Sequence, residues 1–149
     1  MRSYNYHSDE TFIYNTETDE WIDGPKLLEG RRFHSSCALK SRDGTINTVL
    51  IVGGCTKSSF FSSSTELFSI KENIWSRGPD LPIVVRSASC VALPYHAGYS
   101  CLLIGGESEE AKVEYISDSI YALDNDLKTW TFVGHLKEAR YGHAVSLIE

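Results

Sequence analysis

The histidines are the residues here whose type and spacing could support acid–base or metal chemistry. His34 and His143 each follow an arginine by three residues, at Arg31 and Arg140. A histidine beside a charged group can act as a general base or ligate a metal. Because the same spacing occurs twice, a structural role that recurs explains both residues better than chemistry performed once. No serine, carboxylate and histidine set stands out by spacing, and we expect no catalytic residues. The remaining histidines lie in expected loops without a neighbouring cysteine: His7, His96 and His135.

The four cysteines form no Cys-x-x-Cys pair, and this spacing argues against a zinc site. Cys90 and Cys101 fall on strands that we expect to be adjacent, so their side chains could approach each other. A disulfide in a cytosolic protein would be unusual. We therefore expect Cys37, Cys55, Cys90 and Cys101 to be buried or half-buried free thiols, with no metal and no other cofactor. A redox or metal-binding role is the alternative.

The elements that must position these residues repeat along the chain. Trp21, Trp75 and Trp130 recur at intervals of 54 and 55 residues. Four further markers keep the same period, which is typical of a repeat architecture. They are an aromatic residue before each tryptophan (Tyr14, Phe68, Tyr121), a turn after it (Gly24-Pro25, Gly78-Pro79, Gly134-His135), an arginine after the turn (Arg31, Arg86, Arg140) and a glycine pair between units (Gly53-Gly54, Gly105-Gly106).

Each unit is predicted to form four short strands and no useful length of helix. The run 49–52 is apolar on both faces, as is 102–104, and a strand of this kind must be buried on both sides. The last two strands of each unit are joined by polar connectors of hairpin length. The expected strands are 34–39, 49–52, 65–70 and 74–77 in one unit, and 89–93, 100–104, 119–123 and 129–133 in the next.

The combination of markers resembles the kelch repeat. The glycine pair, the run from Tyr14 to Trp21 and the Arg-x-x-His spacing carry the resemblance, which extends from about Thr11 to the end of the chain. It implies an all-β fold, a partial kelch β-propeller with about two complete four-stranded antiparallel blades plus partial blades at both ends. Three departures stand out: Ser89 lies where the histidine is expected, His135 replaces the turn proline, and the third tryptophan comes two residues late.

The expected organisation is one partial propeller over residues 1–149. Residues 1–30 would end one blade, 31–85 and 86–139 would form the next two, and 140–149 would begin a further one. Closed propellers use about four to eight blades. We therefore expect a fragment whose remaining blades lie in a parent protein.

Composition excludes several classes of partner. A net charge of −6 gives no electrostatic footprint for nucleic acid or for an anionic membrane. The chain has no apolar segment long enough to cross a bilayer, no signal-peptide core at its start and no Asn-x-Ser/Thr acceptor. We expect a cytoplasmic protein with no nucleic-acid or membrane partner.

Binding residues are expected where the repeats differ, because loops vary on a repeated scaffold. The connector 55–64 contains two adjacent aromatic residues and one lysine, whereas 107–118 is acidic. In a propeller both would emerge on the same face as the segment 78–86. Such a face suits a protein or peptide partner. For the two phenylalanines, one ring folding back over the blade is an equal alternative. The candidate residues are Lys57, Phe60, Phe61, Arg86, Glu107, Glu109, Glu110, Tyr115 and Arg140.

The resemblance implies a non-enzymatic interaction module. Many kelch proteins present substrates to ubiquitin ligases as adaptors that carry a BTB or F-box region, and others bind actin. A second class, similar to galactose oxidase or the sialic acid epimerases, would be an enzyme whose copper ligands or sugar pocket need blades beyond this sequence. A third would be part of an extracellular kelch receptor.

Overall fold

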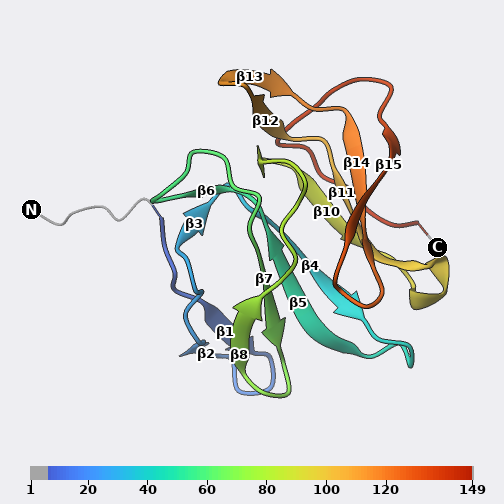
Figure 1. The fold of residues 1–149 in the computed structure, drawn as a ribbon. Coiled ribbons are helices and arrows are strands. Elements are labelled where there is room, and N and C mark those ends of the chain that lie inside the picture. The colour runs from blue at the N-terminus through green and yellow to red at the C-terminus, as the bar shows by residue number, and fades with distance from the viewer. Residues whose placement is uncertain (1–6, 149) are drawn as a thin grey trace, which may run out of the picture.

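A computed structural model describes residues 7–148 of the chain. Two four-stranded antiparallel sheets dominate it, and their strands follow the chain in order (Figure 1). Blade A consists of β4 (Ser35–Lys40), β5 (Ile46–Val52), β7 (Thr65–Ser69) and β8 (Ile74–Arg77). Blade B consists of β10 (Ser89–Ala92), β11 (Tyr99–Ile104), β14 (Ser119–Asp124) and β15 (Trp130–His135). The expected all-β fold is confirmed.

Smaller elements surround the two blades. The hairpin of β1 (Phe12–Asn15) and β2 (Glu20–Asp23) stands beside blade A. Four short strands pair at one end of the blades: β3 (Arg31–Arg32) pairs with β6 (Cys55–Thr56), and β9 (Val85–Arg86) pairs with β12 (Glu107–Glu110). β12 also pairs with β13 (Val113–Ile116), so the acidic connector is a hairpin. One short 3-10 helix, η1 (Tyr95–Ala97), precedes β11. No helix in residues 7–148 is long and apolar enough to cross a membrane.

The main core lies where the blades pack together. Its buried side chains come from both sheets and from the segment that links them, and they include Leu50, Val52, Leu103, Leu123 and Trp130. β4, the first strand of blade A, lies against β10, the first strand of blade B. Burying these faces between sheets supplies the stabilisation that a single sheet lacks.

The tryptophans connect successive units through one repeated hydrogen bond. The indole Nε1 of Trp75 donates to the carbonyl oxygen of Pro25 at 2.9 Å, and that of Trp130 donates to Pro79 at 3.1 Å. Trp130 is 7% exposed, whereas Trp21 on the β1–β2 hairpin is 69% exposed. Trp130 therefore fills space in the core between the sheets, and Trp21 does not.

The glycine pairs mark the sharp exits from β5 and β11. Gly53 and Gly105 have φ values of 66° and 63°, a region that favours glycine. A Cβ atom on Gly53 would lie 2.5 Å from the carbonyl oxygen of Val85. The backbone of the following unit passes too close to allow a side chain here.

The backbone hydrogen bonds align two of the repeat markers, the arginine and the aromatic residue, differently from the spacing in the sequence. The backbone NH of Arg31, Val85 and Arg140 each donates to an equivalent serine carbonyl, so Val85, not Arg86, is the counterpart of Arg31. In the same register, the counterpart of His34 and His143 is Ala88 rather than Ser89.

The aromatic marker before the third tryptophan is also aligned differently. Leu123 pairs with Trp130 as Phe68 pairs with Trp75. The third tryptophan is therefore not late, because Tyr121 is not its aromatic partner.

The two ends of the chain differ in what the structure describes. The expected partial blade over 1–30 lies partly outside the described residues, since residues 1–6 are not among them. Residues 140–148 contain no strand. Even so, the NH of Gly142 donates to the carbonyl of Ser87, as that of Ser87 donates to Phe33. The first strand of a further blade stays a prediction.

Candidate functional site

Most of the candidate residues lie on the two connectors that meet at one end of the blades. Arg86 of β9 is at the centre of a compact cluster that joins them. Its Nε donates to Glu107 Oε2 at 3.0 Å, and its guanidinium carbon lies 4.2 and 4.5 Å from the ring centroids of Phe60 and Phe61. Glu114 Oε2 lies 4.0 Å from Arg86 Nη2. We call Phe60, Phe61, Arg86, Glu107 and Glu114 the Arg86 cluster.

Only one of the two aromatic rings in the Arg86 cluster is available to a partner. The side chain of Arg86 is 13% exposed, and Phe61 is 4% exposed. Phe60 is 54% exposed and meets Phe61 edge to face. One ring therefore folds back over the blade, as the alternative stated above allowed. Arg86 and Phe61 hold the connectors together, whereas Phe60 remains accessible.

The β12–β13 hairpin forms one wall of a groove. A cavity of about 520 Å³ lies between this hairpin and the crossover segment 81–84. Ile83, Tyr115 and Tyr121 supply apolar and aromatic lining, and Glu109 and Glu110 supply carboxylates. We call this cavity the hairpin groove. Burial, and then the nearby Tyr115, raises the pKa of the Tyr121 hydroxyl. The Tyr121 hydroxyl is therefore neutral at physiological pH and can donate a hydrogen bond.

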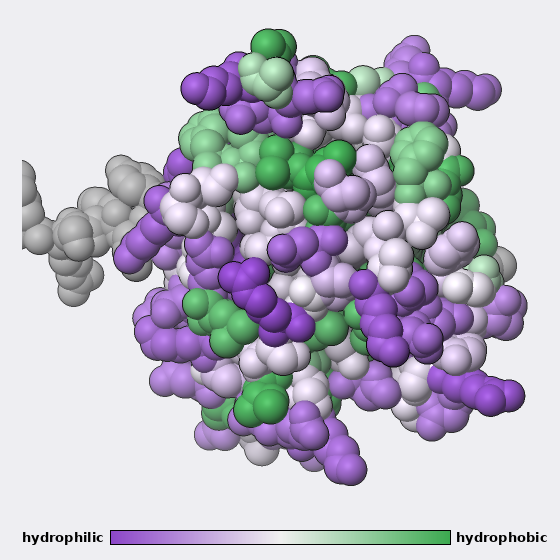
Figure 2. Space-filling model, in the orientation of Figure 1, coloured by the Kyte–Doolittle hydropathy of each residue, from purple (hydrophilic) through white to green (hydrophobic). Residues whose placement is uncertain are grey.

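The hairpin is built to stand out from the blade. Ala111 and Lys112, at its turn, have φ values of 50° and 66°, the type I′ geometry that matches the twist of two antiparallel strands. Val113 and Ile116 are exposed, and hydrophobic side chains emerge among hydrophilic ones at this end of the molecule (Figure 2). Sequence alone suggested an acidic loop, because glutamate is uncommon in strands.

Two other candidates lie apart from these contacts. Lys57 is exposed on the connector 55–64. Arg140 is exposed and its Nε donates to the carbonyl oxygen of Glu138 at 3.4 Å. Its own carbonyl accepts from the NH of Gly106, so its backbone has a structural role. The structure brings Phe60, Phe61, Arg86 and Glu107 into contact, but it does not show Lys57 or Arg140 joining them.

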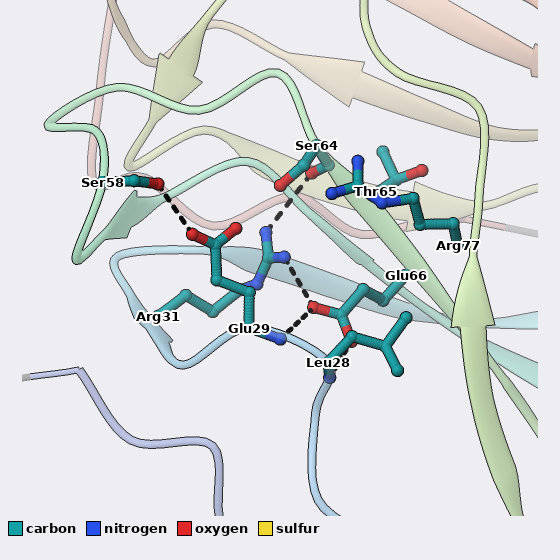
Figure 3. A pocket seen from close by; sticks show the side chains of 8 residues that line it. All are labelled: Leu28, Glu29, Arg31, Ser58, Ser64, Thr65, Glu66 and Arg77. Carbon is teal, nitrogen blue, oxygen red and sulfur yellow. Dashed lines mark hydrogen bonds and ion pairs between the residues drawn. The ribbon is translucent and has the colours of Figure 1, made fainter.

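A second, polar cavity of about 370 Å³ lies beside blade A (Figure 3). Arg31 and Glu66 form a buried ion pair at 2.7 Å, with side chains 1% and 2% exposed. Glu66 also accepts from the backbone NH groups of Leu28 and Glu29, and Ser58 donates to the Glu29 carboxylate at 2.8 Å. These charges neutralise each other within the protein. Arg31 is therefore held in a buried, structural ion pair.

The recurring histidines show no catalytic arrangement in the described residues. Both ring nitrogens of His143 are buried without a hydrogen-bond partner in residues 7–148. Burial, and then the charge of Arg140, lowers the pKa of His143. A Cβ atom on Gly105 would lie 3.1 Å from its ring, so His143 packs over the glycine pair. This contact accounts for the position by packing alone.

Three of the four cysteines gather between the blades. Cys37 on β4 lies with its Sγ 2.8 Å from that of Cys90 on β10, and Cys101 on β11 completes the group. Hydrogen bonds from Cys101 and then Cys90 lower the pKa of Cys37 to about 5, and hydrogen bonding within the group raises those of the other two. The approach of Cys90 and Cys101 was expected. Cys37 was missed because its strand belongs to the other blade.

Comparison with known proteins supports a fold built from kelch repeats. Residues 47–82 match the family model of the Kelch motif. Among solved structures, the chain is similar to one titled "Structure of YjhT", with a TM-score of 0.67 and 16% sequence identity. The match covers 89% of this chain and 45% of that one, so the chain spans less than half of its length. No curated protein matches the sequence. The resemblance to kelch repeats and the propeller-type fold are confirmed.

Proposed function

We propose that this kelch-repeat chain is part of a β-propeller that binds a protein or peptide partner without catalysing a reaction, and that the hairpin groove receives the partner. Kelch repeats generally mediate protein–protein interaction. The observation that carries the proposal is the groove itself, in which tyrosines and carboxylates converge on one cavity. Aromatic side chains in a partly desolvated pocket are typical anchors of binding energy.

The chemistry of the groove defines its partner. Glu109 and Glu110 are exposed at its edge, and the chain as a whole carries a net charge of −6. Tyr115 and Ile83 offer apolar surface beside them. A peptide segment with a basic residue next to an aliphatic or aromatic one would match both the carboxylates and the apolar surface of the groove. Phe60, exposed on the other connector, extends the apolar surface.

The Arg86 cluster acts in support of this surface. By pairing with Glu107 and stacking on Phe60 and Phe61, Arg86 fixes the base of the hairpin to the neighbouring connector. A wall held in place loses less conformational entropy when a partner binds. Arg86 is thus a positioning residue and not a contact residue.

The wider biological role is proposed from the kelch resemblance. We propose a cytoplasmic parent protein in which these blades form the substrate-recognition part of a ubiquitin-ligase adaptor or an actin-binding surface. The Kelch motif supports this class of role. The enzymatic and extracellular alternatives predict copper ligands, a sugar pocket or a signal peptide in the parent sequence.

Selection from a random peptide library tests the proposal. The protein should enrich peptides that place lysine or arginine next to an aliphatic or aromatic residue. The double variant Glu109→Lys/Glu110→Lys should lose this enrichment. A matched control, Glu17→Lys/Glu20→Lys, reverses two exposed charges on the β1–β2 side and should retain it. Enrichment that is absent, or identical in both variants, would refute the assignment of the groove.

A further inference from the structure

The three clustered cysteines suggest a role that protein binding does not explain. They come from three strands and two blades: Cys37 from β4, Cys90 from β10 and Cys101 from β11. All three Sγ atoms lie within 4.8 Å of one another. Cys101 is fully buried, and the other two are half-buried. The sheets therefore bring together sulfurs that are far apart in the sequence.

We propose that Cys37, Cys90 and Cys101 form a three-sulfur site for a single thiophilic metal ion, with monovalent copper the best match. The donor set consists of sulfur alone, and soft thiolates select ions such as Cu(I) and Zn²⁺. A structural zinc site uses four protein ligands, whereas this group offers three among the described residues. Three-coordinate binding therefore favours monovalent copper over zinc.

The spacing of the sulfurs suits such an ion. A metal–sulfur bond of about 2.3 Å places three ligands in a plane about 4 Å from one another. The observed limit of 4.8 Å leaves the sulfurs close to this triangle. Cys37 and Cys90, at 2.8 Å, must separate by about 1 Å, which rotation of the half-buried Cys37 side chain can supply.

The surroundings separate this group from an ordinary buried thiol. Cys55 is also fully buried, but its Sγ lies 2.9 Å from the carbonyl oxygen of Phe60 and it is not a member of the group. It behaves as a small core residue whose polar contacts are with Phe60 and Arg86. The same chain thus provides an internal control for the cluster.

A bound ion would connect the two blades. It would tie β4 of blade A to β10 and β11 of blade B at the place where the first strands pack together. Because the unfolded chain has no preformed site, binding of the ion adds to the stability of the folded state. The metal site would stabilise the contact between the two blades, whereas the hairpin groove is proposed to bind a partner.

Titration of the reduced 149-residue protein with Cu(I) against a competing chelator, without oxygen, tests the inference. We expect one ion per chain, and an affinity lower by at least about 100-fold in Cys101→Ala and in Cys37→Ser. Cys55→Ala should bind as the wild type does. Cd²⁺ serves as a spectroscopic probe, since its sulfur charge-transfer absorption should weaken in the two cluster variants and not in the control.

Folding is checked by circular dichroism of each variant, and the half-buried Cys37→Ser variant keeps the test valid if Cys101→Ala unfolds. Equal affinities in the wild type and in a folded cluster variant would overturn the proposal. So would a reduced wild-type protein that takes up no metal, even if Cys37 and Cys90 form a disulfide when the protein is exposed to oxygen.

Discussion

At the scale of single residues, equivalent positions in the repeat have diverged in chemistry. Arg31 is buried and paired with Glu66, whereas its counterpart Val85 is a buried apolar residue and Arg140 is exposed. The arginine that sequence spacing aligned with them, Arg86, lies one position later and serves the hairpin. Spacing counted from tryptophan could not detect this shift, because only the backbone hydrogen bonds define the register.

The buried ion pair makes a sharp residue-scale prediction. Replacing Arg31 by methionine leaves the Glu66 carboxylate buried without its cation, so the free energy of unfolding should fall by about 3–5 kcal/mol. Arg77→Met is the control, since the Arg77 side chain is 70% exposed and should cost less than about 0.5 kcal/mol. Urea denaturation measures both. Equal losses in the two variants would show that the pair has no special role.

At the scale of elements, sequence patterns predicted the long strands well and the short ones poorly. The predicted ranges for all eight blade strands overlap those observed, because buried apolar runs and polar hairpin connectors mark them. β3, β6 and β9 were missed, since two-residue strands have no periodicity. β12 and β13 were missed because their glutamates disfavour strands, and pairing with β9 supplies the missing stability.

The attachment of the hairpin to β9 can be tested directly. Arg86→Met removes the bonds to Glu107 and the charge stacked on the phenylalanine rings. Amide hydrogens over 107–116 should then exchange at least about tenfold faster, because a charged hydrogen bond of this kind stabilises by about 1.5–3 kcal/mol. Arg77→Met is again the control. Unchanged exchange in the hairpin would mean that Arg86 does not position it.

At the scale of the whole molecule, stability comes from stacking of one blade on the next. Each interface repeats the bond from an indole nitrogen to the proline carbonyl of the preceding unit. Trp130 lies within the interface between blades A and B, and Trp21 lies on an exposed hairpin. The same residue type therefore has very different energetic weight at the two positions.

This difference predicts the effect of truncating each tryptophan. Trp130→Ala should lower the free energy of unfolding by about 3–5 kcal/mol, since it removes a large buried ring and a hydrogen bond. Trp21→Ala should change it by less than about 0.5 kcal/mol. Chemical denaturation followed by circular dichroism compares them. Similar losses at both positions would contradict the packing described for blades A and B.

The proposed binding face was only partly predictable from sequence. Its location followed from the variability of the two connectors, and Phe60, Arg86 and Glu107 do meet there. The groove did not follow, because Ile83 and Tyr121 line it only after the crossover and β14 fold beside the hairpin. The thiol cluster was not predicted for the same reason, since local sequence spacing does not indicate which residues meet when one blade packs on another.

The most direct test of the central claim is the affinity for a library-selected basic peptide, measured by calorimetry on matched variants. The account predicts that Glu109→Lys/Glu110→Lys weakens binding by at least about tenfold, a loss of about 1.4 kcal/mol. Glu17→Lys/Glu20→Lys changes the net charge equally and should leave the affinity within about twofold. Equal weakening by both pairs would show a general charge effect, and no weakening by either would place the partner elsewhere; both results contradict binding in the hairpin groove.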